Sequence, residues 1–248
     1  MMFEEKLIEK IDICNEILKD CQNELYLNMR FLDVALHSLK SEPTMRVQST
    51  ATDGNLFSYN PIFLIEQYKV GNVSINRCYL HSMFHCLFGH IWNKKEQEEL
   101  SLWNLACDIS IEYIIDGLPY RCLRNPLKPY RRAVYEGLLK KISVIHAEGV
   151  FHLLEKAELD IRGVARMIQE FTVDDHSLWE KDSSTPKIPI EQQNKWKDLQ
   201  DKMQTELETF SKEAAEDSKG LLEQLHVENR ERYDYRTFLK KFSVFYSN

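Results

Sequence analysis

Two histidines four residues apart carry the clearest chemical signal in the sequence. They are His81 and His85, in the segment His81-Ser82-Met83-Phe84-His85, and His90 follows five residues later. On a helix, side chains four positions apart point to the same side, so both imidazoles could bind one metal ion. Gly89 would let the chain leave the helix and bring His90 back toward the pair. Two packed histidines without a metal are the alternative.

A second polar group stands at four-residue steps in the segment that follows. Asn104, Asp108 and Glu112 lie among apolar residues, so this stripe is either a solvent-facing surface or a lining turned toward the histidines. In the second case Asp108 can be a further metal ligand or can orient a ligand histidine. Neutral imidazoles combined with a carboxylate suit zinc best.

Further along, His176 follows two acidic residues and precedes Trp179 by three positions. Asp174, Asp175 and His176 could form a second polar site or return to the first one. An aspartate that simply caps a short turn is the favoured alternative. Six cysteines occur without a Cys-x-x-Cys pair in a chain long enough to build a core, so we expect reduced thiols that are not metal ligands.

The elements that would position these residues are mostly helical. Only 8 glycines and 7 prolines interrupt the chain, and the apolar residues recur at helical steps, which predicts a predominantly helical α+β fold with a small β-hairpin beside the histidine helix. The expected elements are a helix over 3–40 with one break, hairpin strands at 45–50 and 56–59, helices over 61–70, 74–88 and 100–116, shorter helices between 130 and 171, and a charged helix over 191–218. In this prediction Ser74 caps the histidine helix and Gly89 ends it.

Composition limits the classes of protein. The chain has 248 residues, 43% of them hydrophobic, and a net charge of -7, which excludes a disordered chain and disfavours nucleic-acid binding. We find neither a signal-peptide pattern nor an apolar run that could span a membrane, so we expect a cytoplasmic protein. The expected organisation is a domain over 1–180 and a charged helical extension over 181–248 that packs on it.

Several blocks together resemble a known family. It is the bacterial metallopeptidase-like domain that precedes a von Willebrand A-like (VWA-like) domain, within the zincin-like superfamily. The blocks that carry the resemblance are Ala51-Thr52-Asp53-Gly54, Tyr59-Asn60-Pro61, the run from Leu80 to His90, the run from Leu102 to Ile109, and the run from Asp174 to Trp179. They cover nearly the whole chain. The resemblance implies a hairpin strand beside a substrate cleft and a histidine helix on its floor.

The sequence departs from this family pattern at one chemically decisive position. A working zincin has a glutamate directly after the first histidine, because that carboxylate takes a proton from the attacking water. Here Ser82 occupies the position, and a serine hydroxyl cannot act as the base at neutral pH. A VWA domain with its D-x-S-x-S loop is also missing from the 248 residues.

Three hypotheses remain open at this point. In the first, the chain is a zinc-binding domain, degenerate as a peptidase, with His81, His85, His90 and Asp108 as ligands, and Asn104 and His176 in an outer or substrate-facing position. The resemblance adds a protein partner, a MoxR-type AAA ATPase or a VWA domain, for which the chain would be an adaptor or substrate-binding component. In the second, it is an active metallohydrolase with Glu112 as the base. In the third, it is a metal-free interaction module.

Overall fold

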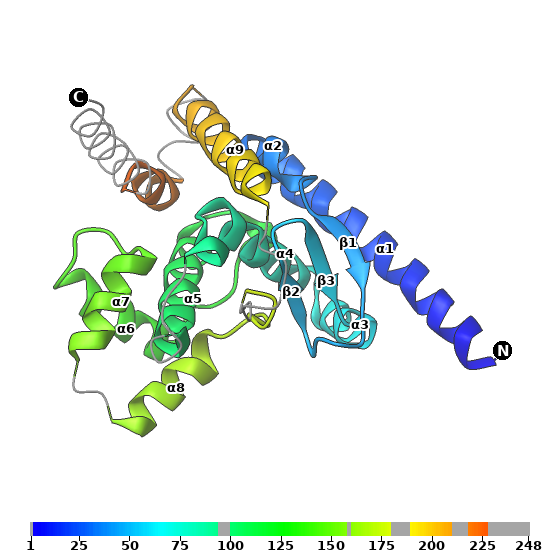
Figure 1. Cartoon of the computed structure of the whole chain (residues 1–248), viewed down its shortest axis with the longest axis horizontal. Helices are drawn as coiled ribbons and strands as arrows, with labels where there is room; N and C mark the ends of the chain where they lie inside the picture. The colour runs from blue at the N-terminus through cyan, green and yellow to red at the C-terminus, as the bar shows by residue number, and fades with distance from the viewer. Residues whose placement is uncertain (1, 94–99, 158–159, 180–188, 210–217, 228–248) are drawn as a thin grey trace, which may run out of the picture.

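The structure is a computed structural model, and it describes residues 2–93, 100–157, 160–179, 189–209 and 218–227 (Figure 1). It confirms the predominantly helical α+β fold: helices account for most of the described chain, and one small sheet lies among them. None of the helices in these ranges is long and apolar enough to cross a bilayer.

The N-terminal helix is long, as the spacing of apolar residues predicts. Helix α1 (Met2–Asn28) buries Cys14, Leu18 and Leu25 on one side. It breaks at Met29, and a 3-10 turn (Arg30–Leu32) leads into the short helix α2 (Asp33–Leu36). The helix prediction for 37–40 is wrong, since the chain enters a strand at Lys40.

The sheet has three strands in the order β1-β3-β2. Strands β2 (Thr50–Thr52) and β3 (Leu56–Tyr59) form the predicted antiparallel hairpin, although its first strand begins at Thr50 and not at Met45. The turn needs Gly54, where φ is +87° and a Cβ would lie 2.7 Å from a side-chain carbon of Ile91. Strand β1 (Lys40–Pro43), which was not predicted, pairs in parallel with β3. Because β2 is at the edge of the sheet, its outer side is open to other segments.

The histidine helix lies in the centre of the fold. Helix α3 (Pro61–Val70), capped by Asn60, precedes helix α4 (Asn72–Leu87), and every residue of α4 from Ile75 onward is buried. The Ser74 cap is wrong: α4 begins two residues earlier, and the Ser74 hydroxyl donates to Gln67. The predicted end is confirmed, because Gly89 takes a left-handed conformation before the 3-10 turn His90–Trp92.

Helix α5 (Leu100–Gly117) separates two hydrophobic clusters. Its Ile111, Ile114 and Ile115 belong to the cluster around α1, α4 and the sheet, while Trp103, Leu105 and Ile109 belong to the second. The second cluster is completed by the shorter helices that follow. These are the 3-10 turn Arg121–Leu123, α6 (Pro129–Leu139), α7 (Ala147–Lys156) and α8 (Ile161–Phe171).

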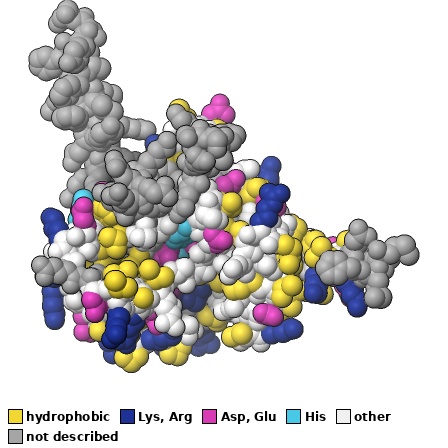
Figure 2. All heavy atoms as spheres, turned by 60° about the horizontal axis from the view of Figure 1, so that its bottom comes forward, with side chains coloured by type: hydrophobic (Ala, Val, Ile, Leu, Met, Phe, Trp, Pro, Cys, Tyr) yellow, Lys and Arg dark blue, Asp and Glu magenta, His cyan; other side chains and the backbone are white. Residues whose placement is uncertain are grey.

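The last described long helix, α9 (Ile190–Thr209), lies beside α2 in Figure 1 and contacts both α2 and α4. Although it is highly charged, its Trp196, Met203 and Leu207 are fully buried along a narrow seam. The indole nitrogen of Trp196 donates to the backbone oxygen of Gly54, 2.7 Å away, which ties α9 to the hairpin turn. On the face in Figure 2, basic and acidic side chains are interspersed among hydrophobic ones. The proposed division at residue 180 stays a prediction.

Candidate metal centre

Five buried side chains from three parts of the chain converge on one point. Helix α4 supplies His81 and His85 one turn apart, helix α5 supplies Asp108, and the segment after α8 supplies Asp174 and His176. One nitrogen or carboxylate oxygen from each residue lies within 4.8 Å of the other four. This group could hold a metal ion.

The distances between the donor atoms fit a shared ion. His81 Nε2 lies 2.9 Å from His85 Nε2, and Asp108 Oδ1 lies 3.3 Å from both nitrogens. Asp174 Oδ1 lies 3.5 Å from His81 Nε2 and 2.8 Å from His176 Nε2. Ligand atoms that bind one ion at about 2.0–2.2 Å are themselves roughly 3–3.5 Å apart. A single cation can therefore contact all five side chains.

Two of these atoms lack the partner that burial demands. Asp174 Oδ1 and His176 Nε2 are buried and only 2.8 Å apart, yet neither makes a hydrogen bond of acceptable geometry within the described residues. Nearly all buried polar atoms in proteins have a partner. Two unsatisfied atoms that face the same point as three other donors indicate that a cation is the missing partner.

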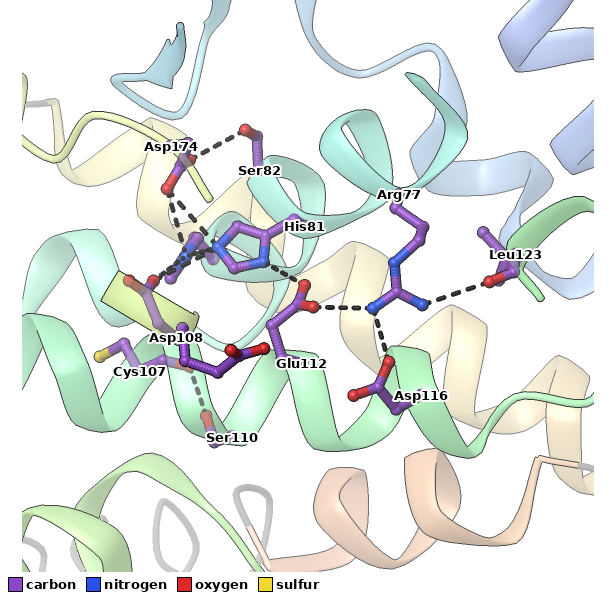
Figure 3. Close-up of polar contacts among 12 residues, drawn as sticks. Arg77, His81, Ser82, Cys107, Asp108, Ser110, Glu112, Asp116, Leu123 and Asp174 are labelled. Atoms are coloured by element: carbon purple, nitrogen blue, oxygen red, sulfur yellow. Dashed lines mark hydrogen bonds and ion pairs between the residues drawn. The ribbon is translucent and has the colours of Figure 1, made fainter. Parts of the chain in front are cut away.

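Glu112 orients the first histidine from behind. Its Oε1 lies 3.0 Å from His81 Nδ1, and because a carboxylate only accepts, Nδ1 carries the proton and Nε2 turns its lone pair toward the cluster (Figure 3). Arg77 and Arg131 donate to the other oxygen of Glu112. Burial alone would raise the pKa of Glu112, but the hydrogen bond from His81 and the two guanidinium charges lower it below its ordinary value of 4.5.

His90 supports the second histidine in a comparable way. Its Nδ1 lies 3.1 Å from His85 Nδ1, on the side of the ring away from the cluster, so the structure places His90 behind His85 and not among the five donors. Burial lowers the pKa of His85 to about 4 and that of His90 well below its ordinary value. Both imidazoles are therefore neutral at pH 7, which is the form that binds metal ions.

The segment that brings in Asp174 and His176 is fixed at several points. The backbone nitrogen of Asp175 donates to the Thr50 oxygen on the edge strand β2, at 2.7 Å. Asp174 Oδ2 accepts a hydrogen bond of 2.9 Å from Ser82 Oγ, a contact drawn in Figure 3. The ring of His176 stacks on Trp179, with 3.7 Å between centroids. The segment thus covers part of the strand edge that the family resemblance assigns to a substrate.

The predicted site residues separate into two groups in the structure. His81, His85 and Asp108 lie together as ligands would, and His176, expected in an outer position, lies with them. Glu112 and His90 contact the histidines from outside. Asn104 is half-buried on α5, and its Oδ1 has no hydrogen-bond partner in the described part of the chain. The six cysteines are all free and buried, and none belongs to the five-residue group.

Sequence reasoning missed Asp174 as a donor. The favoured interpretation was a capping aspartate, and that role belongs to its neighbour, since Asp175 Oδ1 accepts from the backbone nitrogen of Ser177. The available signal was the adjacency of Asp174 to His176, two ligand types one residue apart. It could have been given more weight because a metal site with two helical histidines needs further ligands from elsewhere.

No family model matches the chain, and the comparisons with curated proteins and with solved structures give no match. The resemblance to the zincin-like domain therefore stays a prediction that depends on the quoted sequence blocks. The metal centre is described from its own geometry.

Proposed function

We propose that this protein is a zinc-binding domain related to the zincins, that it holds the ion with His81, His85, Asp108, Asp174 and His176, and that it is degenerate as a peptidase. The observation that carries the proposal is the pair Asp174 Oδ1 and His176 Nε2, two buried, unsatisfied atoms that face three further donors. Zinc suits a mixed set of imidazole nitrogens and carboxylate oxygens and imposes no fixed geometry.

The number and the burial of the donors favour a structural metal site. Catalytic zinc sites leave one position open for water or substrate, whereas structural sites are filled by protein ligands. Here five protein donors face the same point, and the side chains of His81 and His85 have no exposed surface. A bound ion would be enclosed by the protein, which supports the loss of peptidase activity.

The available carboxylates also argue against a working general base. Ser82, at the position of the usual base, is hydrogen-bonded to Asp174. Glu112, the alternative base, contacts Nδ1 of His81, while the five donors gather at Nε2 on the other side of that ring. Its second oxygen accepts from two arginines. These contacts suit a residue that orients His81 and not one that takes a proton from water.

Metal content of the purified protein tests the proposal. The chain is purified without chelator or metal-affinity tag, alongside a His81→Ala/His85→Ala double variant and His152→Ala, which removes an exposed histidine on α7. We expect about one zinc per chain in the wild type and in His152→Ala, and none in the double variant. A wild-type protein that holds no metal after addition of zinc would refute the site. Iron or manganese in place of zinc would refute only the choice of metal.

The partner proposal depends on the family resemblance alone. We propose that the domain acts as an adaptor or substrate-binding component of a MoxR-type AAA ATPase assembly. Co-elution of the purified chain with such an ATPase in size-exclusion chromatography tests it, with and without ATP. Separate elution under both conditions would contradict the adaptor role and would leave the metal proposal untouched.

A further inference from the structure

Ser82 makes an unusual contact for a serine inside a helix. It is fully buried on α4, directly after His81. Serines within helices commonly direct the hydroxyl back to a backbone carbonyl of the preceding turn. The Ser82 hydroxyl instead donates to Oδ2 of Asp174, 2.9 Å away and 92 positions later in the chain.

This contact divides the two oxygens of Asp174 between two partners. Oδ2 accepts from Ser82, and Oδ1 lies among the donor atoms, 2.8 Å from His176 Nε2 and 3.5 Å from His81 Nε2. Because a carboxylate group is planar and rigid, a hydrogen bond that holds one oxygen also sets the direction of the other. The Ser82 hydroxyl therefore determines where Oδ1 points.

We infer that Ser82 is a positioning residue that holds Asp174 in the metal centre. This inference rests on the proposed metal site and deepens it. The residue after the first ligand histidine then has a defined role: where a zincin peptidase carries a base, this chain carries the support of an additional ligand. The substitution that removes the base and the ligand that fills the centre are two parts of the same change.

The geometry also shows why a glutamate would not suit this position. The Ser82 side chain is enclosed, and its hydroxyl is already at hydrogen-bond distance from a carboxylate. A glutamate there would bring a second negative charge against Asp174 in a buried environment, where like charges repel strongly. Asp174 as a ligand and a glutamate at position 82 are therefore incompatible in this fold.

Metal affinity of three serine variants tests the role of Ser82. Zn²⁺ affinity is measured by competition with a chromophoric chelator for the wild type, Ser82→Ala, Ser82→Thr and Ser110→Ala. Ser110 is the matched control: it is also fully buried, and its hydroxyl donates to the Cys107 carbonyl of its own helix. We expect Ser82→Ala to weaken binding by about 10- to 100-fold, the usual effect of removing a group that orients a ligand. Ser110→Ala and the hydroxyl-retaining Ser82→Thr should stay within about threefold of the wild type.

A double-mutant cycle shows whether Ser82 acts through Asp174. If it does, Ser82→Ala should weaken binding in the wild-type background and have no effect in Asp174→Ala. The Co²⁺-substituted protein gives a second readout, since its visible d–d bands should change with Ser82→Ala and not with Ser110→Ala. Far-UV circular dichroism verifies that each variant is folded.

The outcomes separate the inference from the proposed function. Unchanged affinity and an unchanged cobalt spectrum in folded Ser82→Ala would overturn the role of Ser82 while the metal site stands. An equal loss in the Asp174→Ala background would also overturn it, because Ser82 would then act by another route. A wild-type chain that binds neither Zn²⁺ nor Co²⁺ would refute the metal site itself.

Discussion

Replacing Glu112 with glutamine is the most informative single perturbation of this site. Glu112 is buried and accepts from three groups: His81 Nδ1 on one oxygen, and Arg77 and Arg131 on the other. Glutamine keeps the shape of the side chain and removes its charge. The variant therefore weakens these contacts without opening a cavity.

The structure sets the expected loss of stability. A hydrogen bond to a charged group contributes about 1.5–3 kcal/mol, and a neutral acceptor gives roughly half of that. Two guanidinium contacts to Glu112 should therefore lose about 2–3 kcal/mol together. The loss stays below the ~3–5 kcal/mol of a fully orphaned buried charge, because Asp116 still pairs with both arginines.

The pH dependence of this loss has a definite sign. The pKa of Glu112 is lowered in the folded protein from its ordinary value of 4.5, by the hydrogen bond from His81 and the charges of the arginines, against the opposing effect of burial. Its contribution to the free energy of unfolding is therefore complete above pH 4.5 and is lost as the pH falls toward the folded-state pKa. The difference between wild type and Glu112→Gln should shrink accordingly below pH 4.5.

Urea unfolding of the metal-free proteins and Zn²⁺ titration measure both effects. We expect Glu112→Gln to lose about 2–3 kcal/mol and to bind Zn²⁺ about 10- to 100-fold more weakly. Glu170→Gln is the control, since Glu170 contacts Arg131 and Lys128 at the surface; it should cost about 1 kcal/mol or less and leave metal affinity unchanged. A Glu112→Gln protein with wild-type stability and affinity would refute the orienting role. If it also lost a measurable hydrolase activity, Glu112 would be a catalytic base.

Three further outcomes follow from the same structure. Ser82→Glu should bind Zn²⁺ more weakly than Ser82→Ala and show no peptidase activity against casein, because the new carboxylate repels Asp174; tighter binding or proteolysis would contradict this. Burial opposes a charge on His176, but Asp108 and Asp174 raise its pKa to about 10 in the metal-free arrangement, so Zn²⁺ must displace a proton. Affinity should then rise about tenfold per pH unit between pH 6 and 8, and calorimetry in buffers of different ionisation enthalpy should detect proton release; pH-independent binding would be inconsistent with it. Trp196→Phe should lower the free energy of unfolding by about 1–3 kcal/mol in urea denaturation, since a backbone oxygen of the hairpin turn loses its buried donor, and a neutral effect would mean that α9 does not stabilise the turn.

Local patterns predict the parts of the site that lie within single helices. The spacing of His81 and His85 places both imidazoles on one side of α4, and the four-residue steps on α5 place Asp108 opposite them. Gly89 ends the helix as expected. In these cases helical periodicity and one left-handed residue decide the geometry, and both are visible in a short stretch of sequence.

The remaining parts depend on contacts between distant segments. Asp174 resembles a turn-capping residue in its local sequence, and only its tertiary contact with Ser82 shows its place in the site. Strand β1 has exposed side chains at Lys40, Ser41 and Glu42, so it lacks the apolar alternation that predicts a strand. It forms because β3 offers a free edge. Such pairings are not encoded in the segment itself.

The separation of the ligands along the chain gives the metal centre a role in the unfolded protein as well as in the folded one. Ser82 and Asp174 are 92 positions apart, and the histidines and carboxylates beside them have similar separations. An ion held at both ends acts as a cross-link that closes a loop of this length. For a disulfide, chain statistics give about 4.7 kcal/mol for a loop of about 100 residues. One reversible inorganic bond set could thus do for α4, α5 and the segment after α8 what a disulfide does in a secreted protein, in a chain whose six cysteines are all unpaired.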